Sequence, residues 1–196
     1  MKGGVKSMKR TVPVGISNKH LHISQKDLEV LFGVGHQLTP TKELGQPGQF
    51  ACAETVEMIG PKGSFGKVRI LGPIRPETQV EISLTDAIQL GIKAPIRESG
   101  ELEETPGLTL VGSVGKIEME RGLIIAARHI HMDPKTAEEY GVKDKALVTV
   151  RVCGQRGLLF EEVLVRVRED FAPEMHVDTD EGNAAMLSNS QEVEIV

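Results

Sequence analysis

Aromatic residues are scarce in this sequence, which has no Trp, one Tyr and five Phe among 196 residues. This scarcity argues against a surface that stacks single-stranded bases on aromatic side chains. Four of the 23 basic residues lie in the first ten positions, which leaves 19 basic against 28 acidic side chains in the rest of the chain. Nonspecific binding to a phosphate backbone needs the opposite excess of charge. We therefore expect no nucleic-acid partner.

Cysteine and long apolar runs are also rare. Cys52 and Cys153 lie far apart and form no CxxC pair, so we expect two unlinked thiols that pack in the fold. No segment approaches the roughly 18 apolar residues of a membrane span. The segment that follows the basic first ten residues is too short for the apolar region of a secretory signal peptide, and it lacks a small-residue cleavage pattern. The sequence thus predicts a cytoplasmic protein without membrane association.

Glycine and proline are plentiful, at 21 and 10 residues, and they separate short alternating segments. This pattern predicts a mainly β protein with short helices. Helices are expected after the N-cap residues Ser24 and Asp133, and a brief one at 86–90. A loop is expected at 39–48. The predicted strands are 12–17, 55–59, 67–71, 79–84, 109–114, 116–120, 122–127, 146–152, 158–168 and 175–178.

The two halves of the chain share one order of features. Each has an apolar strand, a His-x-His motif, an N-capped helix that ends at glycine, and then a run of strands. We interpret this order as an internal duplication that gives two small β-rich units meeting at a shared site. The predicted division is a first unit at 11–93, a connector at 94–107 and a second unit at 108–196.

The paired histidines suggest metal binding. Residues i and i+2 of an extended segment share a face, so each His-x-His presents two imidazoles together. Corresponding later strands add a third residue, which gives the groups His20, His22 and Glu81, and His129, His131 and His176. Three protein ligands leave a coordination position for water or substrate. A single His-x-His is commonplace, but two in a duplicated frame favour metal, with zinc the best match and cobalt, nickel or iron as alternatives.

Arg75 is the best candidate for binding an anion. It lies six residues before Glu81, and guanidinium binds phosphate through a two-pronged fork. The alternative is a surface arginine whose aliphatic stem covers apolar neighbours. Further candidate donors are Ser17, Asn18, Lys19, Ser99, Arg128 and Asn183. Walker A, dinucleotide-binding, GxSxG and HExxH motifs are absent from the sequence, which argues against nucleotide-driven, serine acyl-enzyme and zincin chemistry.

Four runs of the sequence resemble the PduL-type phosphotransacylases: VGISNKHLHIS at 14–24, LGPIRP at 71–76, ARHIHM at 127–132 and HVDTDEGN at 176–183. The similarity extends over about 12–187. It implies two β-barrel domains capped by short helices, with two zinc ions at their interface. It also implies an acyl-CoA:phosphate acyltransferase that interconverts propanoyl-CoA or acetyl-CoA and phosphate with the acyl phosphate and CoA.

The resemblance also implies roles for individual residues. His20, His22 and Glu81 would hold one zinc near the sulfur of CoA, and His129, His131 and His176 would hold the other. The phosphate would be surrounded by Arg75, Ser17, Ser99 and Asn183, with Arg75 as a catalytic residue. Members packed into bacterial microcompartments often carry an amphipathic N-terminal extension. Only ten residues precede the first predicted unit, so we do not expect shell association, and a homo-oligomer stays open.

No nucleophile is placed for a covalent acyl-enzyme, so direct transfer between the bound substrates is expected. Two other classes stay open. A binuclear metallohydrolase could act on a phosphate ester, amide or thioester, although a barrel of that kind needs ~250 residues and regular βα alternation. A non-catalytic metal- or CoA-binding module is the second alternative, and it would favour full coordination by side chains.

Overall fold

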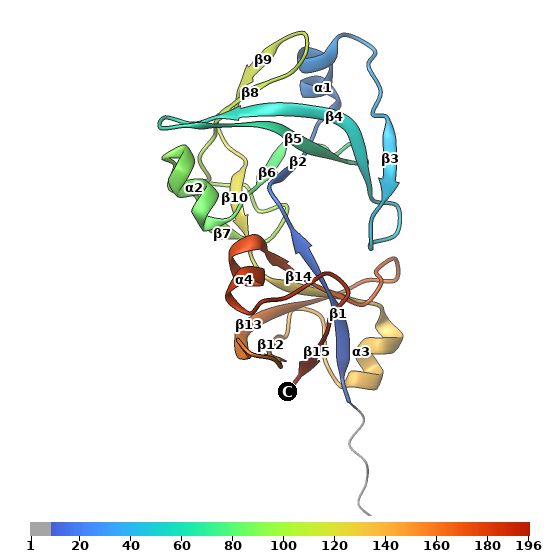
Figure 1. The fold of residues 1–196 in the computed structure, drawn as a ribbon. Coiled ribbons are helices and arrows are strands. Elements are labelled where there is room, and N and C mark those ends of the chain that lie inside the picture. The colour runs from blue at the N-terminus through green and yellow to red at the C-terminus, as the bar shows by residue number, and fades with distance from the viewer. Residues whose placement is uncertain (1–8) are drawn as a thin grey trace, which may run out of the picture. The chain divides into compact units, whose positions relative to one another are not determined.

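The computed structural model describes residues 9–196, so most of the basic first ten residues lie outside the described residues. The described chain is mainly β with four short helices, which confirms the predicted fold class. It forms two compact units built from discontinuous segments (Figure 1). One, the barrel unit, comprises the chain up to Ile16, Arg128–His176 and Gly182–Val196. The other, the sheet unit, comprises Ser17–Ala127 and Val177–Glu181.

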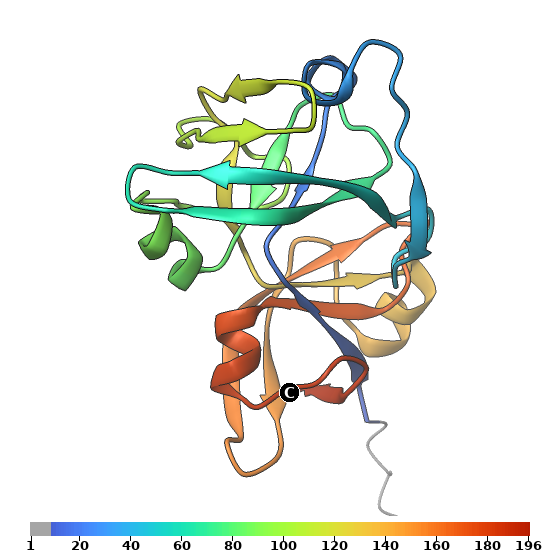
Figure 2. The same cartoon turned by 45° about the horizontal axis from the view of Figure 1, so that its top comes forward.

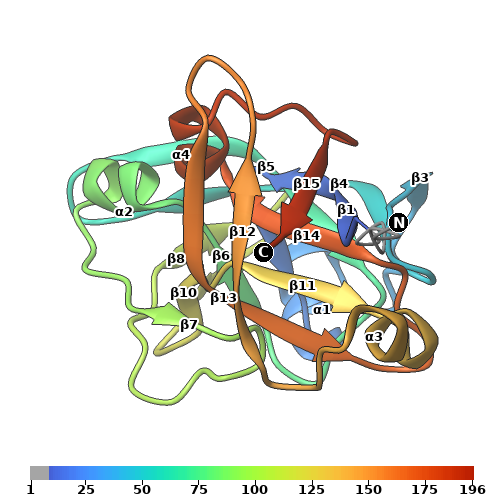
Figure 3. The same cartoon turned by 90° about the horizontal axis from the view of Figure 1, so that it is seen from below.

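The barrel unit is organised around a closed barrel of six strands (Figure 3). Their order is β1 (Thr11–Ser17), β14 (Glu174–Asp178), β11 (His129–Met132), β13 (Leu158–Val167), β12 (Leu147–Val152) and β15 (Glu192–Ile195). Closure joins the first and last strands of the described chain, because β1 pairs antiparallel with β15. Buried aliphatic side chains such as Ile130, Val163 and Val165 fill the interior, so the barrel packs as a core.

Two helices accompany the barrel strands. Helix α3 (Pro134–Tyr140) begins where the Asp133 side chain accepts a hydrogen bond from the amide of Thr136, and it ends at Gly141 in the left-handed conformation. This confirms the predicted N-cap and stop. Helix α4 (Thr179–Ala184) directly follows β14.

The sheet unit contains a nine-stranded, barrel-like sheet (Figure 2). Its order is β7 (Ile96–Arg97), β10 (Leu123–Ala126), β6 (Gln79–Glu81), β2 (His20–His22), β5 (Ser64–Gly72), β4 (Phe50–Ile59), β8 (Thr109–Val111) and β9 (Lys116–Glu118), with β3 (Pro40–Glu43) paired to β4. Leu21, Ile70 and Leu123 belong to its buried core. Helices α1 (Gln25–Phe32) and α2 (Leu84–Leu90) complete the unit.

In the sheet unit one predicted helix is confirmed, and the predictions for two other segments need correction. Ser24 caps α1 and Gly33 ends it, as predicted. The strand predicted at 79–84 is too long, because Ser83 and Asp86 form a capping box that begins α2 at Leu84. The predicted loop at 39–48 contains β3, an edge strand with four exposed residues and no apolar alternation to reveal it.

The two cysteines differ in their exposure. Cys52 is buried as expected, but Cys153 is exposed, so its predicted packing role is wrong. Among residues 9–196, no helix has the length and apolar character to cross a membrane. The division at 94–107, the shared site between units, the cytoplasmic location and the oligomeric state stay predictions.

Candidate metal centres

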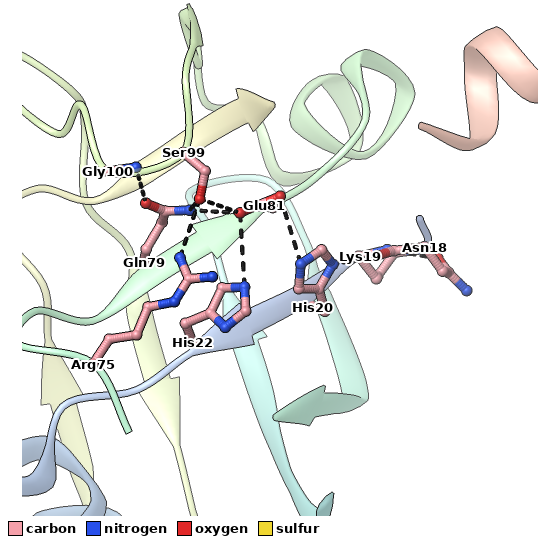
Figure 4. A network of polar contacts seen from close by, with 9 residues as sticks. All are labelled: Asn18, Lys19, His20, His22, Arg75, Gln79, Glu81, Ser99 and Gly100. Atoms are coloured by element: carbon pink, nitrogen blue, oxygen red, sulfur yellow. Dashed lines mark hydrogen bonds and ion pairs between the residues drawn. The ribbon is translucent and has the colours of Figure 1, made fainter. Parts of the chain in front are cut away.

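The first group of predicted ligands comes together in the sheet unit (Figure 4). Strands β2 and β6 are antiparallel, and their register places His20 opposite Glu81. The Nε2 atom of His20 lies 3.5 Å from Oε2 of Glu81, and Nε2 of His22 lies 3.8 Å from Oε1. One potential ligand atom from each residue lies within 4.8 Å of the other two. The pairing of two short strands thus assembles a two-histidine, one-carboxylate group.

Hydrogen bonding at His20 leaves an electron pair directed at a carboxylate. The Nδ1 atom of His20 lies 2.8 Å from the main-chain oxygen of Asn18. A carbonyl oxygen can only accept, so Nδ1 donates, and Nε2 is the ring nitrogen that faces Glu81 and is available to coordinate a metal. Two electron-rich atoms facing each other suit a cation between them. Main-chain orientation of a ligating imidazole in this way is typical of metal sites.

Burial keeps His22 in the form that binds metal. Desolvation lowers the pKa of His22 to about 3, and it outweighs the opposing effect of the Glu81 carboxylate. The ring is therefore neutral near pH 7. Neutral imidazole is the form of histidine that coordinates a metal ion.

A hydroxyl joins Arg75 to the carboxylate of this group. The Oγ atom of Ser99 accepts hydrogen bonds from Nη1 of Arg75 at 3.1 Å and Nε2 of Gln79 at 2.8 Å. It donates to Oε1 of Glu81 at 3.1 Å. Gln79 also donates to Glu81 and accepts from the amide of Gly100 at 2.7 Å. The network fixes both Glu81 and the guanidinium of Arg75 (Figure 4).

Sequence reasoning missed Gln79, although its position offered a signal. It lies two residues before Glu81 on the same strand, so the two side chains share a face. Ser99, predicted as a phosphate ligand, contacts Glu81 in the structure. Its role toward phosphate stays a prediction.

Two of the other candidate donors have partners inside the protein. The Nζ atom of Lys19 lies 3.0 Å from Asp86 and 4.6 Å from the ring centroid of Phe65. The Nε atom of Arg128 donates to the main-chain oxygen of Glu161 at 2.9 Å. These contacts give both side chains a structural role.

The second group of predicted ligands comes together in the barrel unit. The register of β11 and β14 places His129 opposite His176. The ring centroid of His129 lies 4.6 Å from that of His131 and 5.2 Å from that of His176, and the last two are 4.8 Å apart. One potential ligand atom from each again lies within 4.8 Å of the others.

An unsatisfied nitrogen supports a metal role for this group. Burial, and then the neighbouring rings of His129 and His176, lower the pKa of His131 to about 2. The ring is neutral, yet its buried Nδ1 atom has no hydrogen-bond partner among the described residues. A buried polar atom without a partner is costly. Three imidazoles fit a zinc ion, which would also remove part of this unsatisfied polarity at His131.

Ser17 and Asn183 are the remaining predicted phosphate residues, and Glu174 is an acid near the second group that was not predicted. Ser17 is the last residue of β1, and Asn183 lies in α4; their contacts with phosphate stay predictions. The Oε2 atom of Glu174 lies 2.8 Å from Nε2 of His176, and the position of Glu174 two residues before a predicted ligand is the same signal that Gln79 offers.

Comparison with known proteins identifies the family of this chain. The model of the phosphate propanoyltransferase family matches residues 13–188. A protein of Thermotoga maritima named phosphate propanoyltransferase is 61% identical over 184 residues, which cover 93% of this chain and 88% of that protein.

Two further relatives bear the same name. The protein of Rhodopseudomonas palustris is 50% identical over 184 residues, covering 94% of this chain and 81% of the relative. The protein of Clostridioides difficile is 49% identical over 185 residues, which cover 94% of this chain and 88% of the relative. The chain therefore belongs to the phosphate propanoyltransferase family, whose members are acyltransferases.

Proposed function

We propose that this protein transfers an acyl group between coenzyme A and phosphate, with propanoyl-CoA or acetyl-CoA as the thioester. The observation that carries the proposal is the presence of two three-residue ligand groups, one of them bonded through Ser99 to Arg75, in a chain of this family. The names of the relatives support the acyl transfer and the phosphate substrate.

The reaction joins two anionic substrates. An oxygen of phosphate attacks the carbonyl carbon of the thioester, a C–O bond forms, the C–S bond breaks, and the electron pair leaves with sulfur. The protein carries a formal charge of −5, so this step needs local positive charge. Two divalent ions, with zinc the best match, would supply that charge and Lewis acidity when bound.

The residues of the chain divide this work. His20, His22 and Glu81 would hold one ion, and His129, His131 and His176 the other. Arg75 would bind the phosphate, because its guanidinium is fixed by Ser99 and its charge never titrates away. Further contacts with phosphate are proposed for Ser17, Ser99 and Asn183.

We expect direct transfer without a covalent acyl-enzyme. Burial raises the pKa of Cys52 to about 11, so this thiol is a poor nucleophile near pH 7. The test incubates the protein with propanoyl-CoA alone and measures its intact mass. An unchanged mass is expected, and a stable acyl-protein would overturn direct transfer.

The main test measures thiol release from propanoyl-CoA with and without phosphate, together with the metal content of the purified protein. Phosphate-dependent release is expected. Release without phosphate would indicate a metallohydrolase instead, and no release with metal bound would indicate a binding module.

Two substitutions separate metal binding from phosphate binding. His129→Ala is expected to lose metal and activity. Arg75→Ala should keep its metal and raise the phosphate concentration needed for half-maximal rate roughly 10–100-fold, the effect of one lost charged hydrogen bond. His36→Ala and Arg121→Ala are matched controls, because His36 contacts Glu54 and Arg121 is an exposed partner of Glu77. Normal activity in both test variants would contradict the site.

A further inference from the structure

Glu174 holds one candidate ligand of the second group by a short contact. Its Oε2 atom lies 2.8 Å from Nε2 of His176, and both residues lie on β14, two positions apart. The register also places Glu174 opposite His131 on β11. The carboxylate therefore lies on the face of the sheet that carries the histidines.

The direction of this hydrogen bond selects the ring atom that remains available. An ionised carboxylate can only accept, so Nε2 of His176 carries the proton and donates it. Coordination of a metal by this ring would then use the lone pair of Nδ1. In the first group, the main-chain oxygen of Asn18 selects Nε2 of His20 in the same way. Each group thus contains an imidazole oriented by an acceptor, a main-chain oxygen for His20 and a carboxylate for His176.

The space for this carboxylate is provided by a glycine on the neighbouring strand. A Cβ atom at Gly15 of β1 would lie 2.8 Å from Oε1 of Glu174 and 3.4 Å from Cδ2 of His176. The near atom is the end of a flexible side chain, so alanine at this position would displace the carboxylate before it disturbed the main chain. Gly15 is therefore coupled to His176 through Glu174.

We propose that Glu174 is a positioning residue of the second metal centre, which orients His176 for coordination through Nδ1 and supplies the negative charge that Glu81 supplies directly in the first. The proposal rests on the proposed two-metal function. Each centre then has one carboxylate. Glu81 is a direct ligand in the sheet unit, and Glu174 is the hydrogen-bond partner of a ligand in the barrel unit. A carboxylate behind a ligating imidazole makes the ring more basic and fixes its orientation.

The test is a competition titration of the full-length, zinc-loaded protein with a chromophoric chelator, which reports two zinc affinities. His176→Ala identifies the affinity that belongs to the second group. Glu174→Ala is expected to weaken that affinity about 10–100-fold, the usual effect of removing such a partner, and to leave the other affinity unchanged. Glu174→Gln, which keeps an acceptor oxygen, should fall between this variant and the unmodified protein.

Two further variants separate positioning from other roles. Gly15→Ala should weaken the same affinity without changing a carboxylate or a ligand. Glu192→Gln is the matched control, since it removes one exposed carboxylate from the same unit, and it should change neither affinity.

Cobalt substitution separates a positioning residue from a direct ligand. The visible spectrum of Co²⁺ reports its coordination number, which should stay the same in Glu174→Ala and change in Glu81→Gln. An unchanged second affinity in both Glu174 variants, or a changed coordination number in Glu174→Ala, would overturn the proposal. A protein that binds no second zinc even when unmodified would instead overturn the two-metal function.

Discussion

Burial sets the protonation state of single residues in both ligand groups. The pKa of His22 is lowered to about 3 and that of His131 to about 2, with desolvation as the largest cause in each. In the unfolded chain both residues return to an ordinary pKa near 6.5. Below that pH these two histidines are protonated in the unfolded state but not in the folded state. The free energy of unfolding of the metal-free protein therefore decreases as pH falls.

This linkage predicts a pH dependence of known sign. Between pH 8 and pH 5 the free energy of unfolding of the metal-free protein should fall by about 2 kcal/mol for each of the two histidines. His131→Asn removes one of these groups, so its stability should fall less over the same range. Urea denaturation after metal removal by chelation measures the difference. Equal pH dependence in this variant and the unmodified protein would contradict the buried, neutral state of His131.

Four of the six candidate ligands could be found from sequence because His-x-His on a strand needs only the two-residue period of extended backbone. Glu81 and His176 are inferred from the correspondence between the two halves of the chain. The hydrogen-bond partners of the ligands could not be found from sequence. Gln79 and Glu174 share a face with a ligand, yet residue spacing does not show that their side chains turn toward it. The contact between Ser99 and Glu81 joins residues 18 positions apart, and it depends on where a loop places a hydroxyl.

At the level of elements, a buried polar network joins the two strands that carry the first ligand group. The amide of Ser24, at the start of α1, donates to Oγ1 of Thr78 at 3.0 Å. Thr78 in turn donates to the carboxylate of Asp27, which also accepts from Oγ of Ser24 at 2.9 Å. Ser24 lies two residues after His22, and Thr78 lies three before Glu81. The network therefore helps to fix the spacing of β2 and β6.

Thr78→Val should destabilise the fold by about 1–3 kcal/mol, because it leaves the buried amide of Ser24 without its acceptor and removes one of the hydroxyl donors to Asp27. Thr78→Ser keeps the hydroxyl and should restore most of that stability. Urea denaturation of the two variants measures the difference. If the valine and serine variants were equally stable, the network would contribute nothing beyond packing.

Competing local signals explain which elements could be predicted. The caps at Ser24 and Asp133 have side chains that satisfy helix amides, and both helices begin where the sequence indicates. The segment 79–84 carries two signals, β alternation and the Ser83 cap, and the cap prevails from Leu84 onward. Strand β15 was missed, although Val193 and Ile195 alternate with acidic residues and are buried.

At the scale of the whole molecule, the order of the chain does not match the order of its units. The first strand, β1, pairs with the last, β15, and the segment between β1 and β11 forms the other unit. The shared order of features in the sequence predicts two similar halves, but it does not indicate which half a terminal strand joins. For this reason the predicted division at 94–107 stays a prediction, although the barrel and the barrel-like sheet confirm the architecture.

Closure of the barrel by the last strand leads to a prediction for the whole molecule. Strand β15 pairs with both β1 and β12, and its Val193 and Ile195 side chains are each only 2% exposed. Deleting residues 192–196 would expose two strand edges. It would also forfeit about 3–6 kcal/mol of apolar burial, a large part of the stability of an ordinary domain. The barrel should open, and the three histidines of the second group should lose their zinc.

The sheet unit should survive this deletion, because its strands β4 and β5 pair with each other and pack on a separate core. Hydrogen exchange is expected to show lost protection in β11 and β13 and retained protection in β4 and β5, with one zinc bound instead of two. Deleting Val196 alone is the control, since its side chain is 43% exposed. Equal loss of protection in both units would mean that they unfold as one cooperative structure, and that the second metal centre does not depend on barrel closure alone.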